Sequence, residues 1–272
     1  MTILQFSDPD ITEVLIEANE EDIGFLIDII TDSGAGRISL SSDSCKQLVK
    51  AKVGRAMDGD RALIAQELTR FGGNSLMNMF RRGTGVPYRE ILADVANHVR
   101  VPKKADASCA DLEMAVISKL AEQSLDRMDE SDRMRFFESF GRRYMPGTAP
   151  ALLASQVATL GSTAGTAAQL AGAVASSAMS HFVGRGVAVA GTTALSRTVG
   201  VMAGPIGWAI TGLWTAYDLA SPAYRVTVPC VIQIGYMRQK LLQGTACPSC
   251  ETVPPPGAKF CTECGSSLTT KS

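Results

Sequence analysis

Apolar residues recur at helical spacing through the first 143 residues, and their pattern predicts a series of amphipathic helices. The first is expected to begin at Pro9 after the cap Asp8, and the second follows the cap Asn19. Later helices are predicted from the apolar positions Ile64, Leu68 and Phe71; Leu76, Met79 and Phe80; Tyr88, Ile91, Leu92, Val95 and Val99; Leu112, Val116, Leu120 and Met128; and Met134, Phe137 and Phe140.

Helix-start signals support this pattern, while strand signals are scarce. Ser108 and Asp111 form a predicted capping box, and Ser131 is expected to open the last helix of the charged half. Only residues 225–234 could also be extended, and Pro229 interrupts them. The sequence therefore predicts an all-α fold.

Residues 144–237 form a long stretch that is poor in charge. Its charged residues are Arg185, Arg197, Asp218 and Arg225, whereas charged residues are frequent before it. Small residues recur four apart, in the pairs Gly161 and Gly165, Ala167 and Ala171, Ser176 and Ser180, and Gly200 and Gly204. This spacing favours close helix contact. Most of the stretch is therefore expected to be hidden in a protein core, in a partner or in lipid.

Two interpretations of this stretch stay open. Residues 199–217 are uncharged and carry Trp208, Trp214 and Tyr217, which suits a span with interfacial aromatic residues. Residues 151–180 are long enough but only weakly hydrophobic, which suits a buried helical hairpin. A segment that is soluble in one state and inserted in another fits both signals.

The tail carries the strongest motif of the chain. Cys247 and Cys250 form one Cys-x-x-Cys pair, and Cys261 and Cys264, followed by Gly265, form a second pair ten residues later. Two such pairs can supply four thiolates to one tetrahedral zinc ion, and a closed set of four thiolates is structural, not catalytic. The sequence therefore predicts a zinc ribbon, with two disulfides or a redox pair as alternatives.

Composition and charge narrow the class of protein. The net charge is −1, so no global attraction to nucleic acid or anionic lipid is expected. The first residues predict no cleaved secretory signal, and Cys45, Cys109 and Cys230 are expected to be reduced thiols of a cytoplasmic protein. The predicted organisation is a charged helical domain at 1–143, a Gly/Ala-rich apolar helical region at 144–240 and the zinc ribbon at 245–270.

No enzyme signature is present. The chain has no nucleophile elbow, Walker loop or dinucleotide fingerprint, and its two histidines are expected to be structural. The one polar group worth testing combines Glu67 and Arg70 with Arg89, Glu90 and Asp94. An ion-pair network is the simpler interpretation of that group, so the sequence predicts a protein that is not an enzyme.

Four blocks of sequence resemble the bacterial YaaW family. They are residues 67–76 (ELTRFGGNSL), 86–95 (VPYREILADV), 204–208 (GPIGW) and 221–229 (SPAYRVTVP). The resemblance covers roughly residues 5–240 and implies no activity. The family's middle portion is also grouped with the ubiquinol–cytochrome c chaperone domain, which is helical and helps assemble a membrane respiratory complex. The resemblance thus implies a helical chaperone or adaptor, to which the zinc ribbon is appended.

These observations together predict a non-enzymatic helical interaction or assembly protein. Its expected partner is another protein or a second copy of the chain, recruited through the ribbon. Association with the inner membrane stays open, nucleic acid is disfavoured, and no small-molecule substrate is indicated. The alternatives are a membrane-perturbing stress or defence effector and an enzyme that uses the polar group above.

Overall fold

The computed structural model describes residues 8–37, 40–72, 86–102, 106–183, 223–250, 252–254 and 258–268. Within these ranges the regular structure is α-helical, apart from an isolated antiparallel bridge between Phe260 and Ser267, which confirms the all-α prediction. The described helices are α1 (Pro9–Glu17), α2 (Glu20–Thr31), α3 (Ser42–Val53), α4 (Asp58–Gly72), α5 (Tyr88–His98), α6 (Cys109–Leu125), α7 (Glu130–Ser139), α8 (Pro150–Leu160), α9 (Ala164–Val183) and α12 (Tyr224–Thr245).

Side-chain caps place the first helices where the sequence predicts them. An Asp8 carboxylate oxygen accepts the Asp10 N–H at 3.0 Å, and the Asn19 side chain accepts the Asp22 N–H at 2.8 Å. The predicted capping box at the start of α6 is also formed. Each cap satisfies a backbone donor that has no partner inside its own helix.

Three helix starts differ from the prediction. Helix α3 was not expected, because Leu48 and Ala51 are its only fully buried residues and so its apolar periodicity is weak. Helix α4 begins at Asp58, before its apolar positions start to repeat. Helix α7 begins at Glu130 because Asp129, not Ser131, supplies the cap.

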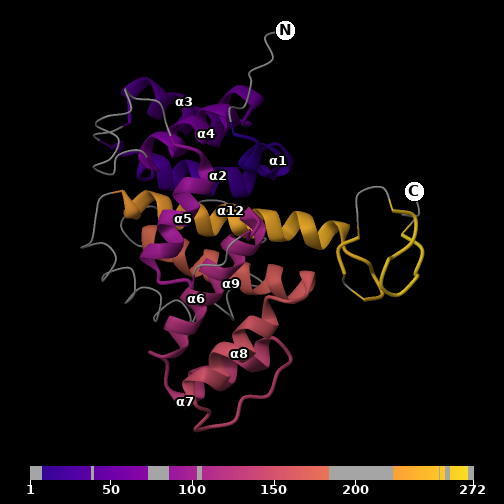
Figure 1. The fold of residues 1–272 in the computed structure, drawn as a ribbon. Helices are drawn as coiled ribbons and strands as arrows, with labels where there is room; N and C mark the ends of the chain where they lie inside the picture. The colour runs from indigo at the N-terminus through magenta and orange to yellow at the C-terminus, as the bar shows by residue number, and fades with distance from the viewer. Residues whose placement is uncertain are drawn as a thin grey trace.

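Helix α12 is the central element of the fold. It runs between a layer of α1 to α4 and a group that includes α6 and α9 (Figure 1), and it packs against α2, α6 and α9. Residues 226–235 are all buried, so this part of the helix is enclosed by the protein on every side. The segment for which an extended conformation was an alternative is thus helical, with Pro229 inside it. The core contains residues on both sides of the predicted boundary at 143, from Ile11 to Met237.

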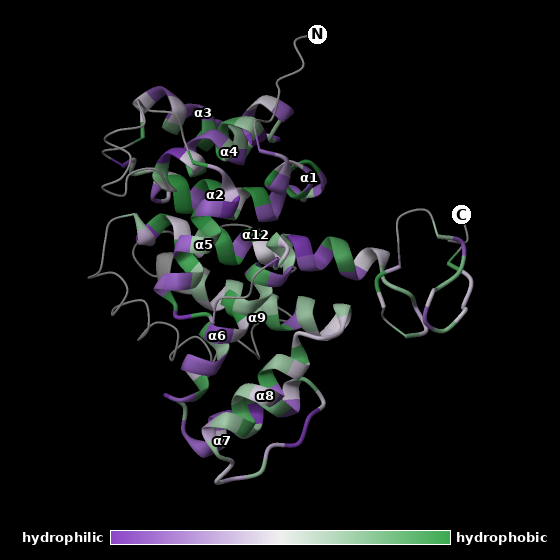
Figure 2. Cartoon of the chain, in the orientation of Figure 1, coloured by the Kyte–Doolittle hydropathy of each residue, from purple (hydrophilic) through white to green (hydrophobic). Residues whose placement is uncertain are grey.

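In the described part of the charge-poor stretch, α9 and α12 are closely packed, whereas α8 is buried on one side only and Leu152 is 60% exposed. Most of α8 and α9 is hydrophobic (Figure 2), and Ala167 and Ala171 are buried. Gly172 allows α9 to approach α12, since a Cβ at this position would lie 3.1 Å from the Tyr236 ring. None of the helices within the described ranges has the length and apolar character needed to cross a bilayer. The candidate span at 199–217 lies outside those ranges.

Gly235→Ala is expected to lower the free energy of unfolding by about 1–3 kcal/mol, because the site has no room for a methyl group. The new Cβ would lie 2.9 Å from Ile117 Cδ1 and 3.2 Å from Glu113 Cβ. Urea unfolding followed by circular dichroism measures the change. Gly244→Ala in the same helix is the control, because nothing lies within 4 Å of its Cβ. Equal stability of the two variants would contradict close packing of α12 against α6.

Candidate metal centre and buried ion pairs

The four tail cysteines converge just beyond the end of α12. The Cys247 and Cys264 sulfur atoms lie 3.6 Å apart, and those of Cys250 and Cys261 lie 3.4 Å apart. All four sulfur atoms lie within 4.8 Å of one another. The structure therefore brings together every residue that the sequence predicts as a metal ligand.

Backbone hydrogen bonds shape the two turns that hold these cysteines. In the first turn, the Ser249 N–H points to the Cys247 sulfur at 3.4 Å. In the second, the Cys261 N–H donates to the Ser266 carbonyl at 2.8 Å, and the Gly265 N–H donates to the Cys261 carbonyl at 3.0 Å. Gly265 has a φ of +71°, a conformation that disfavours residues with a Cβ. The glycine after the second Cys-x-x-Cys pair thus allows the backbone to make this turn.

The sulfur positions fit a tetrahedral metal site. Metal–sulfur distances of about 2.3 Å imply tetrahedron edges of about 3.8 Å, close to the separations observed here. The Ser266 hydroxyl lies 3.2 Å from the Cys264 sulfur, and hydrogen bonds with the side chain and backbone of Ser266 and with the neighbouring cysteines lower the pKa of the Cys264 thiol to about 6. A lowered pKa favours the thiolate, which is the form that binds metal. The four cysteines could therefore hold a metal ion.

The residues of the candidate polar group point to different partners. Glu67 is buried in α4 and accepts hydrogen bonds from Arg70 at 3.2 Å and from the Ser44 hydroxyl at 3.1 Å. Arg89 in α5 instead donates to the Ala107 carbonyl at 2.6 Å, next to the start of α6. Glu67 and Arg89 thus stabilise different helix contacts.

The other two acids of that group lie on α5, near a ring stack. Burial, and then the charge of Glu90, raises the pKa of Asp94. His98 stacks on Tyr224 of α12 with ring centroids 3.8 Å apart, and burial lowers the pKa of this histidine. This surface joins α5 to α12.

Lowering the pH from 7.5 to 5 is expected to reduce stability partly through His98. Because its folded pKa lies below its unfolded value of about 6.5, the unfolded chain takes up the proton first. His98→Phe keeps an aromatic ring against Tyr224 and should lose less stability over this range. Urea unfolding at several pH values measures the difference, with His181→Gln as the control at the other histidine. Identical pH dependence of wild type and His98→Phe would refute this assignment.

A buried ion pair that the sequence did not reveal joins four helices. Glu113 of α6 is fully buried and accepts hydrogen bonds from Arg238 Nε at 2.7 Å, Arg238 Nη2 at 3.0 Å and the Tyr88 hydroxyl at 2.8 Å. Arg238 also donates to the Asp10 carbonyl of α1 at 2.6 Å. Burial raises the pKa of Glu113, although its bonds to Arg238 and Tyr88 oppose this shift. The sequence did offer one sign that Glu113 is buried. This residue lies three positions before Val116, on the apolar side of the predicted helix.

Two more buried carboxylates have lysine partners. Lys240 of α12 lies 2.6 Å from Asp22, and Lys52 of α3 lies 2.6 Å from Asp28, so both pairs anchor a helix to α2. Arg238 and Lys240 follow directly after the charge-poor stretch. Together they fix the register of the central helix against α2 and α6.

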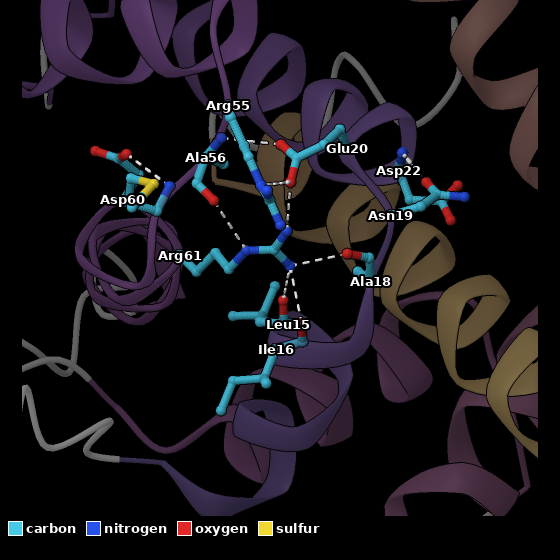
Figure 3. A network of polar contacts seen from close by, with 11 residues as sticks. Leu15, Ile16, Ala18, Asn19, Glu20, Asp22, Arg55, Ala56, Asp60 and Arg61 are labelled. Atoms are coloured by element: carbon cyan, nitrogen blue, oxygen red, sulfur yellow. Dashed lines mark hydrogen bonds and ion pairs between the residues drawn. The ribbon is translucent and has the colours of Figure 1, made fainter.

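Arg61 of α4 closes the end of α1 (Figure 3). Its guanidinium donates to the carbonyls of Leu15, Ile16 and Ala18, with distances of 3.2 Å to Ile16 and 2.9 Å to Ala18, and it pairs with Glu20 at 2.8 Å. The last carbonyls of a helix have no partners within that helix and favour a cation. This buried arginine therefore has a structural role.

The fold and the cysteine cluster define a helical protein with a tail whose four thiols could hold a metal ion. The chain belongs to the UPF0174 family. Two UPF0174 proteins of Helicobacter pylori (strain J99) are 36% and 37% identical to it, over 66% and 65% of this chain and 71% and 87% of those proteins. UPF0174 protein YaaW of Escherichia coli K12 is 28% identical over 88% of this chain and 97% of YaaW. The resemblance to the YaaW family seen in the sequence is thus confirmed.

Two further comparisons gave no match. No family model matches the chain, and no solved structure matches it significantly.

Proposed function

We propose that this protein is a non-enzymatic helical interaction protein whose C-terminal ribbon binds zinc and recruits a protein partner. The observation that carries the proposal is the convergence of four cysteine sulfur atoms within 4.8 Å at the end of α12. Four thiolates favour zinc over magnesium or calcium, which prefer oxygen ligands. Four protein ligands also leave no open position for a substrate, so the zinc is structural.

The exposed surface of the ribbon supports a role in protein recruitment. The ribbon lies beyond the end of α12, to one side of the helices (Figure 1). Phe260 is 62% exposed although it adjoins the ligand Cys261, and Val253 is also exposed. Exposed aromatic residues on a rigid scaffold are frequent anchors of protein interfaces. Lys259 and Glu263 balance each other, which disfavours nucleic acid as the partner.

The internal polar groups support a structural role for the helical part. The ionic groups of Glu113, Asp22 and Arg61 each have hydrogen-bonded partners that join helices. Burial raises the pKa of Cys230 to about 12, which makes this thiol a poor nucleophile. Cytoplasmic residence is part of the proposal, because the described cysteines include buried free thiols.

Metal analysis followed by affinity capture tests the proposal. Full-length protein purified without added metal is expected to contain one zinc per chain by mass spectrometry, and Cys261→Ser should lose it. A tagged full chain should then capture a protein that a chain ending before Gln243 does not, and Phe260→Ser should weaken this capture. Cys45→Ser, outside the ribbon, is the control. A metal-free wild type, or equal capture by the full and truncated chains, would contradict the proposal.

A further inference from the structure

Helix α3 presents an outward face that the zinc ribbon does not explain. We define the basic–apolar face as Lys46, Lys50, Val53 and Met57. The first three lie at positions i, i+4 and i+7 and therefore on one side of α3, and Met57 follows the end of the helix. Leu48 and Ala51 are buried on the opposite side, and α3 lies at the outer edge of the fold (Figure 1).

Residues 42–57, which contain α3, have a net positive charge, whereas the chain as a whole has a net negative charge. Residues 42–57 contain the cations Lys46, Lys50, Lys52 and Arg55 and a single acid, Asp43, whereas the whole chain has a net charge of −1. Lys52 pairs with Asp28 at 2.6 Å, and Arg55, whose side chain is 82% exposed, lies 3.9 Å from the Glu20 carboxylate. Within the described ranges, neither Lys46 nor Lys50 takes part in an ion pair, and Asp43, one turn before Lys46, is the acid on the same side of α3, so this side has a net positive charge.

Apolar side chains are exposed beside these cations. Val53 is 86% exposed and Met57 is 65% exposed. Met57 follows four residues after Val53, where the chain leaves α3 and leads into α4. Exposed large apolar side chains that gather in one place mark a contact surface more often than scattered ones do.

We propose that the basic–apolar face docks the protein on an anionic lipid surface. Lysines near such a surface are attracted to its negative potential, and adjacent apolar side chains enter the region between head groups and acyl chains. A lipid surface uses both halves of the face. A nucleic acid, or a protein segment that is acidic throughout, would use the lysines but leave Val53 and Met57 in water. This attachment is peripheral and does not depend on the zinc site.

Vesicle co-sedimentation of the full chain tests the docking surface. Vesicles of phosphatidylcholine with phosphatidylglycerol should bind the protein, whereas vesicles of phosphatidylcholine alone should not, and added salt should weaken the binding. Lys46→Gln/Lys50→Gln should weaken binding by about 30-fold, since each lysine near an anionic surface contributes about 1 kcal/mol. Val53→Ser/Met57→Ser should weaken it by roughly tenfold through the lost apolar contact. All four substitutions are at exposed or solvent-facing positions, and thermal unfolding confirms that each variant folds.

The loop between α7 and α8 and the first turn of α8 offer a matched control, because they too carry two exposed arginines, Arg142 and Arg143, and two exposed apolar residues, Met145 and Leu152. Arg142→Gln/Arg143→Gln and Met145→Ser/Leu152→Ser should leave vesicle binding unchanged. Cys261→Ser should also still bind vesicles, which separates this inference from the proposed zinc site. The proposal is overturned if anionic vesicles are not bound, if only the control variants weaken binding, or if Val53→Ser/Met57→Ser has no effect. In the last case, RNA that competes with vesicles for the lysines would identify a polyanion as the ligand.

Discussion

Arg238→Met is expected to lower the free energy of unfolding by about 3–5 kcal/mol at pH 7, because it leaves a buried carboxylate without its cation. Glu113 is fully buried, and Arg238 supplies two of its three hydrogen bonds. The substitution also removes the bond to the Asp10 carbonyl, which ties α1 to α12. Urea unfolding followed by circular dichroism measures the loss.

The pH dependence of this loss identifies its cause. Without Arg238, burial should raise the pKa of Glu113 further above its unfolded value of about 4.3. A carboxyl with a raised folded pKa stabilises the fold below its unfolded pKa, and this stability is lost as the pH rises through the folded pKa. The difference from wild type should therefore shrink as the pH falls from 7 to 5. Glu113→Gln combined with Arg238→Met should recover part of the loss at pH 7.

Arg135→Met is the matched control for Arg238→Met. Arg135 pairs with Asp132 at 3.6 Å on the surface of α7, and its side chain is largely exposed. Exposed pairs of this kind contribute about 0–1 kcal/mol. Equal effects of the two arginine substitutions would show that the Glu113 pair is not a central element of the core.

The helices that the sequence predicted well carry two local signals. In α1, α2 and α6, a regular apolar stripe follows a side-chain cap, and both features are fixed by neighbours in the sequence. The cluster of four cysteines was predictable for the same reason, because each Cys-x-x-Cys pair is a local motif. Helix α3 lacks a broad buried stripe, so the local pattern gave no comparable signal for it.

The buried ion pairs depend on contacts between distant parts of the chain. Glu113 and Arg238 are 125 residues apart, and Asp22 and Lys240 are 218 residues apart. Nothing in the sequence near either residue indicates its partner. The charge-poor stretch predicted that its helices would be buried, but Arg238 and Lys240, just beyond it, determine how α12 is anchored. Pairings between distant side chains require the tertiary structure.

Removing the metal is expected to unfold the ribbon and leave the described helices, α1 to α9 and α12, folded. Among the described ribbon residues, Cys247 and Cys261 are the fully buried ones, so apolar burial cannot hold this segment together. The hydrophobic core of the helices ends at Met237, before the first ligand. The binding free energy of the metal is then the folding free energy of the ribbon. Chelation under reducing conditions should therefore speed amide exchange and proteolysis within residues 246–268.

A single ligand substitution should have the same local effect. Loss of a group that hydrogen-bonds to a metal ligand lowers metal affinity by roughly 10–100-fold. Cys264→Ser removes one of the four sulfur atoms itself, so we expect it to lower zinc affinity by more than this. The melting temperature of the helices should stay within about 2 °C of wild type, since a surface change that touches no core contact costs little. Cys45→Ser lies outside the ribbon and should retain full zinc. If chelation instead melted the helices, or if the ribbon stayed protected without metal, the metal would not be what folds this segment. The ribbon would then have to be stabilised by contacts with the helices.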